Sequence, residues 1–519
     1  MVSRNLANTN NQLAKIFKPI FFCFPQAPKI TLYLFLIIGF SLLVHILCMT
    51  STVLIVEEAY YWNYAQHLDF SYLDHPPMVA LLIKLSTLIF GTNEFGVRMT
   101  SLICWVLMAF FSFRLTHLIN KGAGPYVLML LAILPFFFLQ ALVITPDIPL
   151  LVCWAASLYC LYRSLILNQS NYWYAAGIWL GLGMLSKYTI SLLGLATLFY
   201  VITIPSARSW LRRKEPYICA LIAMFIFTPV IYWNATHGWV SFIFQSSRRF
   251  NSISSTSLHH LLGLSFIFLT PLGVLGFWEL MKKNIVDKCN ISDNSKHFIL
   301  IFTWFPWGVF ALFSFNHQIK FNWIGPIYLA FIPWLASLMA NITRKRTLWI
   351  KTSILLLVGY SAILLLANFN KSERIQQKIF KDLIAWNTLT KQFHELASHI
   401  ETQTKLRPTF VPLDTYHIGS ELAFYQAKAL NQGTITRAYP IVGAHIFGEN
   451  SLMYRYWSKK EDYFGKPLIL ISPNARSFEN PELRKQVIEQ SQLNKIEAVS
   501  QGQGIPSTPY YYKVVQMKE

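Results

Sequence analysis

The sequence has little charge, and acidic residues are especially scarce. Of its 519 residues 13% are charged, and 44 Lys and Arg stand against 24 Asp and Glu. A soluble protein carries about 25% charged residues, so a single water-soluble globule is excluded as the simplest reading. The net charge of +20 comes from short basic clusters between apolar runs. Such clusters are typical of membrane topology signals rather than of nucleic-acid binding, and we expect no nucleic-acid partner.

Cysteine is also sparse, with seven residues that follow no metal-ligand spacing and none beyond Cys289. This pattern indicates neither a disulfide framework nor a zinc site. What the sequence has in abundance is apolar side chains: 54% of its residues are hydrophobic and 16% are aromatic. Together these features predict an all-α polytopic membrane protein.

About 20 mostly apolar residues are needed to cross a bilayer, and eleven segments are candidates. The first, Leu32–Met49, follows a polar leader without a signal-peptide cleavage site, so we expect an uncleaved helix. The pair 172–186 and 188–204 is separated only by Lys187, and the two segments form either two helices or one long kinked helix. The other candidates are 97–118, 125–144, 148–167, 217–235, 259–280, 298–315, 324–341 and 349–367.

The basic clusters predict the orientation of these segments. With residues 1–30 as a cytoplasmic leader, every dense cluster of Lys and Arg falls on the cytoplasmic side, as the positive-inside rule requires. An odd number of spans then places the chain after about residue 370 on the outer side. We therefore expect three parts: the leader, a transmembrane part over 31–369 with a long first external loop at about 51–96, and a periplasmic part over 370–519.

The last 150 residues carry more charge and contain no run of spanning length. Strands are predicted at Thr409–Leu413, Leu468–Ser472 and Tyr510–Val515, and helices at Ser420–Ala429 and Pro481–Gln490, which indicates a small α/β domain. An amphipathic helix precedes them, and its apolar stripe must lie on the membrane surface or on the rest of the domain. The stripe consists of Ile375, Ile379, Leu383, Trp386, Leu389, Phe393, Leu396 and Ile400.

Candidate catalytic groups gather on the predicted outer side. In the first external loop, Glu57 and Glu58 begin a helix over 57–69 whose aromatic residues suit the headgroup level of the bilayer. A second apolar stretch follows at 78–90, so the loop is predicted to hold interfacial helices. Another acid, Asp147, begins the apolar run after Thr145-Pro146. Either site alone is explained by an acid at a helix N-terminus, but two sites on one membrane face favour chemistry.

Ordered motifs across residues 30–340 resemble one family. They are Glu57-Glu58-Ala-Tyr60-Tyr61-Trp62, Asp74-His75-Pro76-Pro77, Gly96-Val97-Arg98, Thr145-Pro146-Asp147, Leu185-Ser186-Lys187-Tyr188 and Asn322-Trp323, and Glu421-Leu422-Ala423-Phe424-Tyr425 follows them. This series is similar to bacterial members of the protein-mannosyltransferase and aminoarabinose-transferase superfamily, which are membrane glycosyltransferases of the GT-C fold.

The resemblance implies a polyprenyl-phosphate-linked sugar as donor, and a lipid A, envelope glycan or protein hydroxyl as acceptor. It implies transfer at the periplasmic face of the bacterial inner membrane by an inverting displacement. The family's base is usually the Asp of an Asp-Glu pair, and here Glu57 stands at that position, so Glu57, Glu58 and Asp147 all stay candidates for the base. Residues expected to bind the donor phosphate or substrate are Tyr60, Tyr61, Asp74, His75, Arg98, Lys187, Arg248, Arg249, Lys320, Asn322 and Trp323.

No cofactor is predicted. Aminoarabinose transferases carry a metal-binding His shortly before an Arg-Phe pair, and the matching stretch of this chain, residues 244–250, has no His, so a divalent metal is not supported. Two other classes of function compete with the transferase. A lipid transporter or flippase would also have many spans and a basic outer cavity. Such proteins often show internal repeats, and this sequence shows none. A membrane sensor whose outer domain binds glycan is the third reading, and it predicts scattered acids instead of acids that face one cavity.

Overall fold

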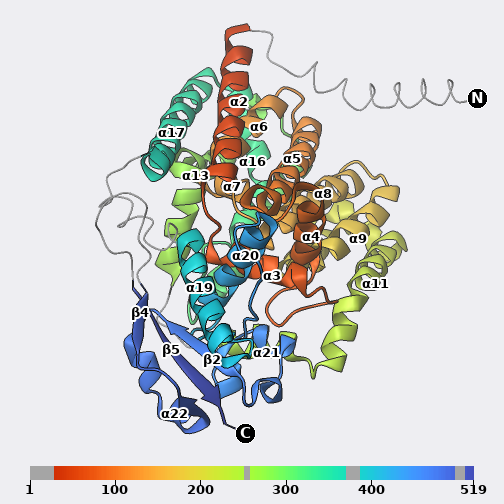
Figure 1. Cartoon of the computed structure of the whole chain (residues 1–519). Coiled ribbons are helices and arrows are strands. Elements are labelled where there is room, and N and C mark those ends of the chain that lie inside the picture. The colour runs from red at the N-terminus through yellow and green to blue at the C-terminus, as the bar shows by residue number, and fades with distance from the viewer. Residues whose placement is uncertain (1–27, 251–256, 370–385, 497–508, 519) are drawn as a thin grey trace, which may run out of the picture.

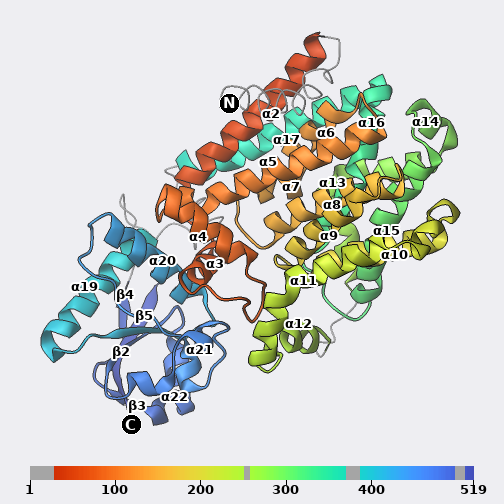
Figure 2. The same ribbon diagram turned by 90° about the vertical axis from the view of Figure 1, so that its right-hand side faces the viewer.

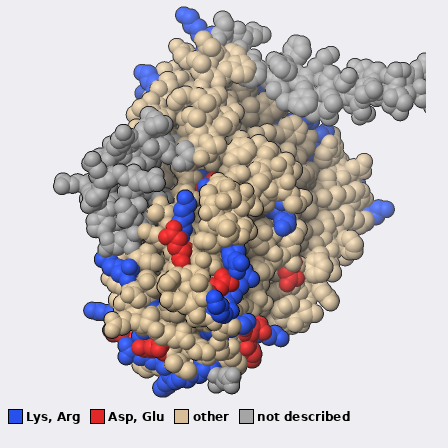
Figure 3. Space-filling view, in the orientation of Figure 1, with Lys and Arg blue, Asp and Glu red and all other residues tan. Residues whose placement is uncertain are grey.

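The computed structural model describes residues 28–250, 257–369, 386–496 and 509–518. Helices make up most of it, and the strands gather with a few helices at one end (Figures 1 and 2). On the face drawn in Figure 3, charged side chains lie mostly over these C-terminal elements, and the helical part is largely uncharged. This contrast is what a lipid-facing part joined to a water-facing part requires.

Six described helices are long and apolar enough to cross a membrane. Two further pairs pass the same test but are bent, Tyr188–Thr203 with Pro205–Arg212 by 110° and Gly325–Asn341 with Thr343–Ile363 by 115°, which raises the number to eight at most. Eleven spans therefore stay a prediction. The six helices are α2 (Pro28–Ser51), α5 (Glu94–Ile119), α8 (Asp147–Leu165), α11 (Glu215–Thr236), α13 (Leu258–Leu280) and α15 (Asp293–Ser314).

Several predicted spans are shorter or interrupted in the structure. The segment predicted over 125–144 breaks at Leu134, whose backbone is extended just before Pro135; a residue before proline disfavours the helical conformation. The stretch 172–204 forms two helices, which settles that alternative. The remaining helices of this part are α6 (Gly124–Ile133), α7 (Pro135–Gln140), α9 (Asn171–Met184), η1 (Tyr188–Ile190), α10 (Ser191–Thr203), η2 (Pro205–Arg212), α12 (Val240–Phe250), α14 (Lys283–Lys288), η3 (Gly325–Ala330), α16 (Ile332–Asn341) and α17 (Thr343–Phe369).

Helix α8 is the central helix of this part. It is 94% buried over its apolar window and packs between α5 and α9. Helix α9 in turn lies against α11 at glycine positions. A Cβ at Gly177 would lie 2.6 Å from the backbone oxygen of Cys219, and one at Gly181 would lie 3.0 Å from that of Ala223. The Gly-xxx-Gly spacing thus lets the two backbones approach closely.

The first loop contains α3 (Val56–Gln66) and α4 (Met78–Phe90), close to the predicted helices. The aromatic residues of α3 pack inside the protein, since Tyr60, Tyr61, Trp62 and Tyr64 are all buried. Their place at the headgroup level of the bilayer stays a prediction. The helix α20 (His417–Asn431) covers α3 (Figures 1 and 2), and burial against another helix removes these rings from lipid.

The C-terminal part holds a five-stranded sheet in the order β1-β2-β5-β3, with β4 also paired to β5. Strands β1 and β2 are parallel, with Thr409 opposite Leu468, and β5 runs antiparallel to its neighbours. The three predicted strands are present. The strands are β1 (Thr409–Pro412), β2 (Pro467–Ser472), β3 (Val487–Glu489), β4 (Asn494–Ile496) and β5 (Tyr510–Met517), and the other elements are α19 (Trp386–Thr404), η4 (Ala444–Phe447), α21 (Tyr454–Trp457), η5 (Lys460–Tyr463), η6 (Ala475–Glu479) and α22 (Pro481–Gln486).

The two faces of this sheet belong to different cores. Ile469 and Ile471 join the large core that also contains the helical part, whereas Leu468 and Leu470 pack in a smaller second core. Such alternation is expected of a strand buried on both faces. The helix predicted over Pro481–Gln490 is too long: it ends at Gln486, because Val487 begins a strand that pairs with the end of β5.

The amphipathic helix begins, in the described part of the chain, at Trp386. The buried stripe of α19 contains Trp386, Leu389, Phe393 and Ile400, and α19 packs on α20. The apolar stripe of the described part of this helix therefore packs on the rest of the protein and not on the membrane surface. Ile375, Ile379 and Leu383 lie outside the described residues.

Candidate active site

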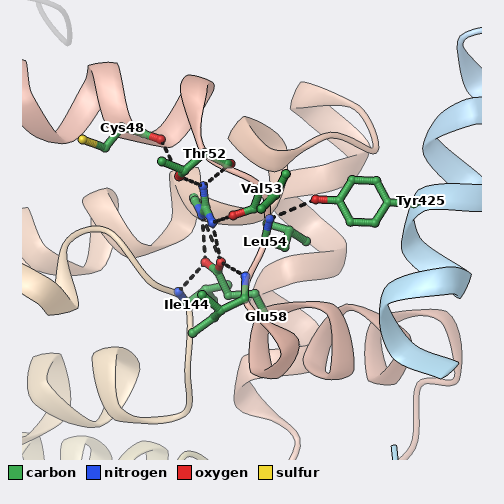
Figure 4. Close-up of polar contacts among 9 residues, drawn as sticks. Cys48, Thr52, Val53, Leu54, Glu58, Ile144 and Tyr425 are labelled. Atoms are coloured by element: carbon green, nitrogen blue, oxygen red, sulfur yellow. Dashed lines mark hydrogen bonds and ion pairs between the residues drawn. The ribbon is translucent and has the colours of Figure 1, made fainter. Parts of the chain in front are cut away.

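Glu58 forms a buried ion pair with Arg98 at the start of α3. The Arg98 guanidinium donates to both carboxylate oxygens of Glu58, at 3.0 Å from Nε and 2.6 Å from Nη2, and the side chains are 4% and 0% exposed. Arg98 also donates to the carbonyls of Thr52 and Val53. The Glu58 carboxylate accepts two backbone N–H groups as well, from Ile55 at 3.1 Å and Ile144 at 3.2 Å (Figure 4).

This pair joins four segments: the chain just after α2, the start of α3, helix α5 and the loop before α8. Both charges are fully used by partners inside the protein, as buried charges must be. Glu58 and Arg98 therefore hold each other in place, and their predicted roles as candidate base and as substrate-binding residue stay predictions.

Asp147 occupies a second polar cluster at the start of α8. Its Oδ1 accepts from Nζ of Lys187 at 2.7 Å and its Oδ2 accepts from Nδ2 of Asn322 at 2.6 Å. Asp147 is 1% exposed and Lys187 is 5% exposed. The sequence placed all three among the candidate site residues, and the structure brings them together from α8, the α9–η1 turn and the loop before η3.

The backbone around Lys187 explains how it reaches Asp147. Helix α9 ends at Met184, and the Lys187 N–H donates to the Gly183 carbonyl at 2.8 Å. A Cβ at Gly183 would overlap the end of the Ile190 side chain, so a larger residue here would displace Ile190. The Leu185 carbonyl accepts from the Met78 N–H at 3.0 Å, which ties the turn to the first loop just after Pro76-Pro77.

Tyrosines of α3 surround Asp74. The Tyr64 hydroxyl donates to an Asp74 carboxylate oxygen and lies 3.0 Å from the Tyr60 hydroxyl, while Gln245 donates to the Asp74 carbonyl. His75 lies edge-on to Tyr61, with ring centroids 5.7 Å apart. The predicted substrate residues Tyr60, Tyr61, Asp74 and His75 thus form one cluster, to which Gln245 adds a contact that the sequence did not indicate.

Three of the acids act on the phenol of Tyr61. Burial raises the pKa of its phenol well above 10, and the carboxylates of Asp74, Asp147 and Glu57 raise that pKa further. Three carboxylates from different segments therefore lie within electrostatic reach of one phenol. Among them Glu57 alone is exposed. Within the described side chains its carboxylate makes no hydrogen bond or ion pair, whereas Asp74 and Asp147 accept hydrogen bonds.

The other predicted residues are less closely joined. Trp323 is buried near Phe310 and Phe313, and Lys320 is exposed three residues before it, with the Lys320 carbonyl accepting from the Trp323 N–H at 3.2 Å. Arg248 and Arg249 fall near the end of α12, and their side chains lie outside the described part, so their role in binding phosphate stays a prediction.

Two residues of the C-terminal part complete the cluster: Tyr416, which sequence reasoning missed, and Glu421, which begins the last of the motifs quoted above. Tyr416 packs on Tyr60 with ring centroids 4.5 Å apart. Glu421 is 1% exposed, and its Oε2 has no hydrogen-bond partner among the described residues. Burial and then the nearby Glu58 carboxylate raise the pKa of Glu421 well above 4.5. No local pattern signalled these contacts, because their partners lie more than 300 positions away in the chain.

A metal site is not apparent in what the structure describes: those residues include no group of three or more His, Cys, Asp or Glu placed to hold an ion. The expectation that no metal or cofactor is bound stays a prediction.

Comparison with known proteins gives two matches by sequence. The family of dolichyl-phosphate-mannose-protein mannosyltransferases matches residues 74–233, which include Asp74, Arg98, Asp147 and Lys187. The lipid A galacturonosyltransferase RgtD of Rhizobium johnstonii is 25% identical over 210 residues, 39% of this chain and 43% of that protein. The chain thus aligns with less than half of that relative's length.

Comparison by structure extends over nearly the whole chain. The crystal structure of apo ArnT from Cupriavidus metallidurans has a TM-score of 0.62 at 13% identity, covering 93% of this chain and 98% of that one. The same protein bound to undecaprenyl phosphate gives 0.59 at 14% identity, covering 92% and 97%. At this identity the likeness shows the fold, which is the GT-C fold of a multi-pass membrane protein.

These findings confirm the resemblance that the motifs indicated. The chain has the fold of the GT-C membrane glycosyltransferases, and part of its sequence is similar to the mannosyltransferase family and to RgtD. Within that class it is similar to the protein-mannosyltransferase and aminoarabinose-transferase superfamily.

Proposed function

We propose that this protein transfers a hexosyl or pentosyl unit from a polyprenyl-phosphate donor to a hydroxyl of lipid A at the periplasmic face of the inner membrane. The acceptor is argued from RgtD, whose name assigns it to lipid A, and the donor from ArnT, which was crystallised with undecaprenyl phosphate. The alternative acceptors, to be compared with lipid A, are another envelope glycan and a protein hydroxyl. The proposal includes a cytoplasmic N-terminus and a periplasmic domain over 370–519.

Glu57 is the base in this proposal. The observation that carries it is the difference between the three candidate acids: Glu58 is bound by Arg98 and Asp147 is bound by Lys187 and Asn322, but Glu57 is exposed beside the same cluster. A base must be able to approach the substrate hydroxyl within hydrogen-bond distance. Glu57 alone meets this condition without losing a buried partner.

The reaction then proceeds as a single displacement. The Glu57 carboxylate accepts the proton of the acceptor hydroxyl while that oxygen forms a bond to the anomeric carbon. The bond from that carbon to the phosphate oxygen breaks, and the polyprenyl phosphate leaves with the electron pair. Lys187, with Lys320 from the loop before η3, stabilises the phosphate charge, and attack opposite the leaving group inverts the anomeric carbon.

Asp147 has a positioning role in this scheme. Its carboxylate fixes the ammonium of Lys187 and the amide of Asn322, so the cation is already in place before the donor phosphate binds. Preorganised charges of this kind stabilise a transition state without having to reorient during the reaction.

The test is transfer by purified protein in proteoliposomes that contain lipid A and a polyprenyl-phosphate sugar, followed by mass spectrometry of the lipid. Glu57→Gln should lower turnover by about two to four orders of magnitude, the usual range for a general base, and Glu57→Asp should retain part of the activity. Glu461→Gln, an exposed glutamate far along the chain, is the control and should be unchanged.

Normal turnover by Glu57→Gln would refute Glu57 as the base. If Glu57→Gln, Glu58→Gln and Asp147→Asn all remained active, the carboxylate mechanism would be wrong. The lipid flippase is the alternative function in that case, and movement of a labelled polyprenyl phosphate across the same vesicles would identify it.

A further inference from the structure

A polar crevice opens at one edge of the C-terminal sheet. Strands β1 and β2 are parallel, and Ile441 pairs in parallel with Phe410 on the other side of β1. Three neighbouring segments therefore end at the same edge. In α/β sheets, ligands bind in the crevice beyond the carboxyl ends of parallel strands.

The crevice is lined by the residues that follow those three ends. Its volume is about 300 Å³, at the lower limit of small-molecule pockets. Its apolar lining residues are Leu413, Ala444, Phe447 and Leu483. The polar residues around it are Asp414, Thr415, Glu449, Asn450, Ser477 and Asn480.

These polar groups are held in fixed orientations. Asn480 Nδ2 donates to Glu449 Oε1 at 2.9 Å, and Asn480 Oδ1 accepts from the first turn of α22. Asp414 Oδ2 accepts from the His417 N–H at 2.7 Å, while Asp414 Oδ1 is buried without a partner among the described residues. A buried carboxylate oxygen without a partner is costly, so a ligand donor near it would bring stabilisation.

The chemistry of the lining selects the ligand. All the lining residues are described, and they include no Lys, Arg or His, so a phosphate or an anionic sugar would lack a cation to pair with. Two carboxylates, two amides and two hydroxyls instead offer many acceptors and several donors. A ring with several hydroxyls on its edge and an apolar face toward Phe447 matches this combination.

We propose that this crevice is a saccharide-binding site for a neutral hexose or N-acetylhexosamine. The segment after Asp414 leads directly to the active site, since Tyr416 packs on Tyr60. The bound sugar is then a neighbouring unit of the acceptor glycan, and this last step rests on the proposed function. Binding itself does not depend on it.

The experiment measures binding and transfer separately on the full-length protein in nanodiscs. Saturation-transfer difference NMR with methyl β-D-glucopyranoside and N-acetylglucosamine as probes reports binding. The variant Thr415→Val/Glu449→Gln removes a hydroxyl and a charge without changing side-chain size, and Glu449 is exposed, so the fold should be retained. Glu461→Gln is the control on the same domain.

For at least one probe we expect about a tenfold loss of affinity in the double variant, as removal of a hydrogen bond to a charged group gives. The control should match the wild type, and Glu57→Gln should bind the probe normally while failing in transfer. Equal signals from wild type and double variant for both probes would overturn the site. A signal that is lost on adding a chelator would also overturn it, because the crevice would then hold a cation.

Discussion

The ion pair between Glu58 and Arg98 makes the sharpest prediction about stability. We consider Arg98→Met, which keeps the length and the apolar part of the side chain but removes the guanidinium. Glu58 then retains two backbone N–H donors, from Ile55 and Ile144, and loses all of its cationic partner. The carboxylate stays buried, because no part of its side chain is exposed.

The magnitude follows from the burial of both partners. Removing one member of a buried pair costs about 3–5 kcal/mol, whereas replacing both by neutral groups is often close to neutral. Arg98→Met and Glu58→Gln should therefore each lower the free energy of unfolding by about 3–5 kcal/mol. The double variant should lose less than the sum of the two, which gives a positive coupling energy.

The assay is unfolding by sodium dodecyl sulfate from mixed micelles, followed by tryptophan fluorescence, for the wild type, both single variants and the double variant. Lys485→Met is the control, because its pair with Glu482 is exposed at 70% and 68% and such pairs contribute about 0–1 kcal/mol. If the single variants unfolded within 1 kcal/mol of the wild type, as exposed pairs do, the reasoning from burial would be refuted.

Three further predictions concern other parts of the molecule. Lys187→Met should raise the KM for the polyprenyl-phosphate donor by about tenfold or more, since it removes a charge-assisted hydrogen bond; a donor titration with unchanged KM would contradict this role. The pKa of Glu421 is higher in the folded than in the unfolded chain, so the folded state binds more protons above about pH 4.5 and stability falls as pH rises. Glu421→Gln should remove this fall. In thermal melts between about pH 5 and 8, the melting temperature of the variant should rise relative to that of the wild type as the pH rises. Gly177→Ala places a Cβ against the Cys219 backbone and should destabilise by about 1–3 kcal/mol, whereas Gly39→Ala, which meets nothing within 4 Å, should not.

The sequence predicted the helices and strands whose own residues show a clear hydrophobic periodicity. The strands at 409, 468 and 510 and the helices at 57 and 78 follow from periodicity and from proline positions. The end of α22 was missed because Val487 is in a strand only through its pairing with β5, which no neighbouring residue signals. Tertiary pairing overrides helix propensity at such positions.

The sequence predicted which residues belong to the candidate site, but it did not predict which role each of them has. Glu57 and Glu58 are adjacent, and successive residues of a helix point about 100° apart. Which of the two turns inward is decided by Arg98, 40 positions away, and by the Ile144 N–H. The sequence order contains the acids and the cations, but the pairing that separates a structural glutamate from an exposed one exists only after α3, α5 and the loop before α8 have packed together.

The aromatic face of α3 shows why the C-terminal part belongs to the site. Tyr and Trp on a short helix beside a membrane suit the bilayer interface, yet here α20 takes the place of lipid. The Tyr425 hydroxyl accepts from the Leu54 N–H at 3.0 Å, and Lys428 pairs with Glu94 at 2.6 Å. These contacts fix the chain on both sides of the Glu58–Arg98 pair. Glu57 therefore projects from a helix that is anchored by membrane-spanning elements on one side and by the C-terminal part on the other, so its position depends on both.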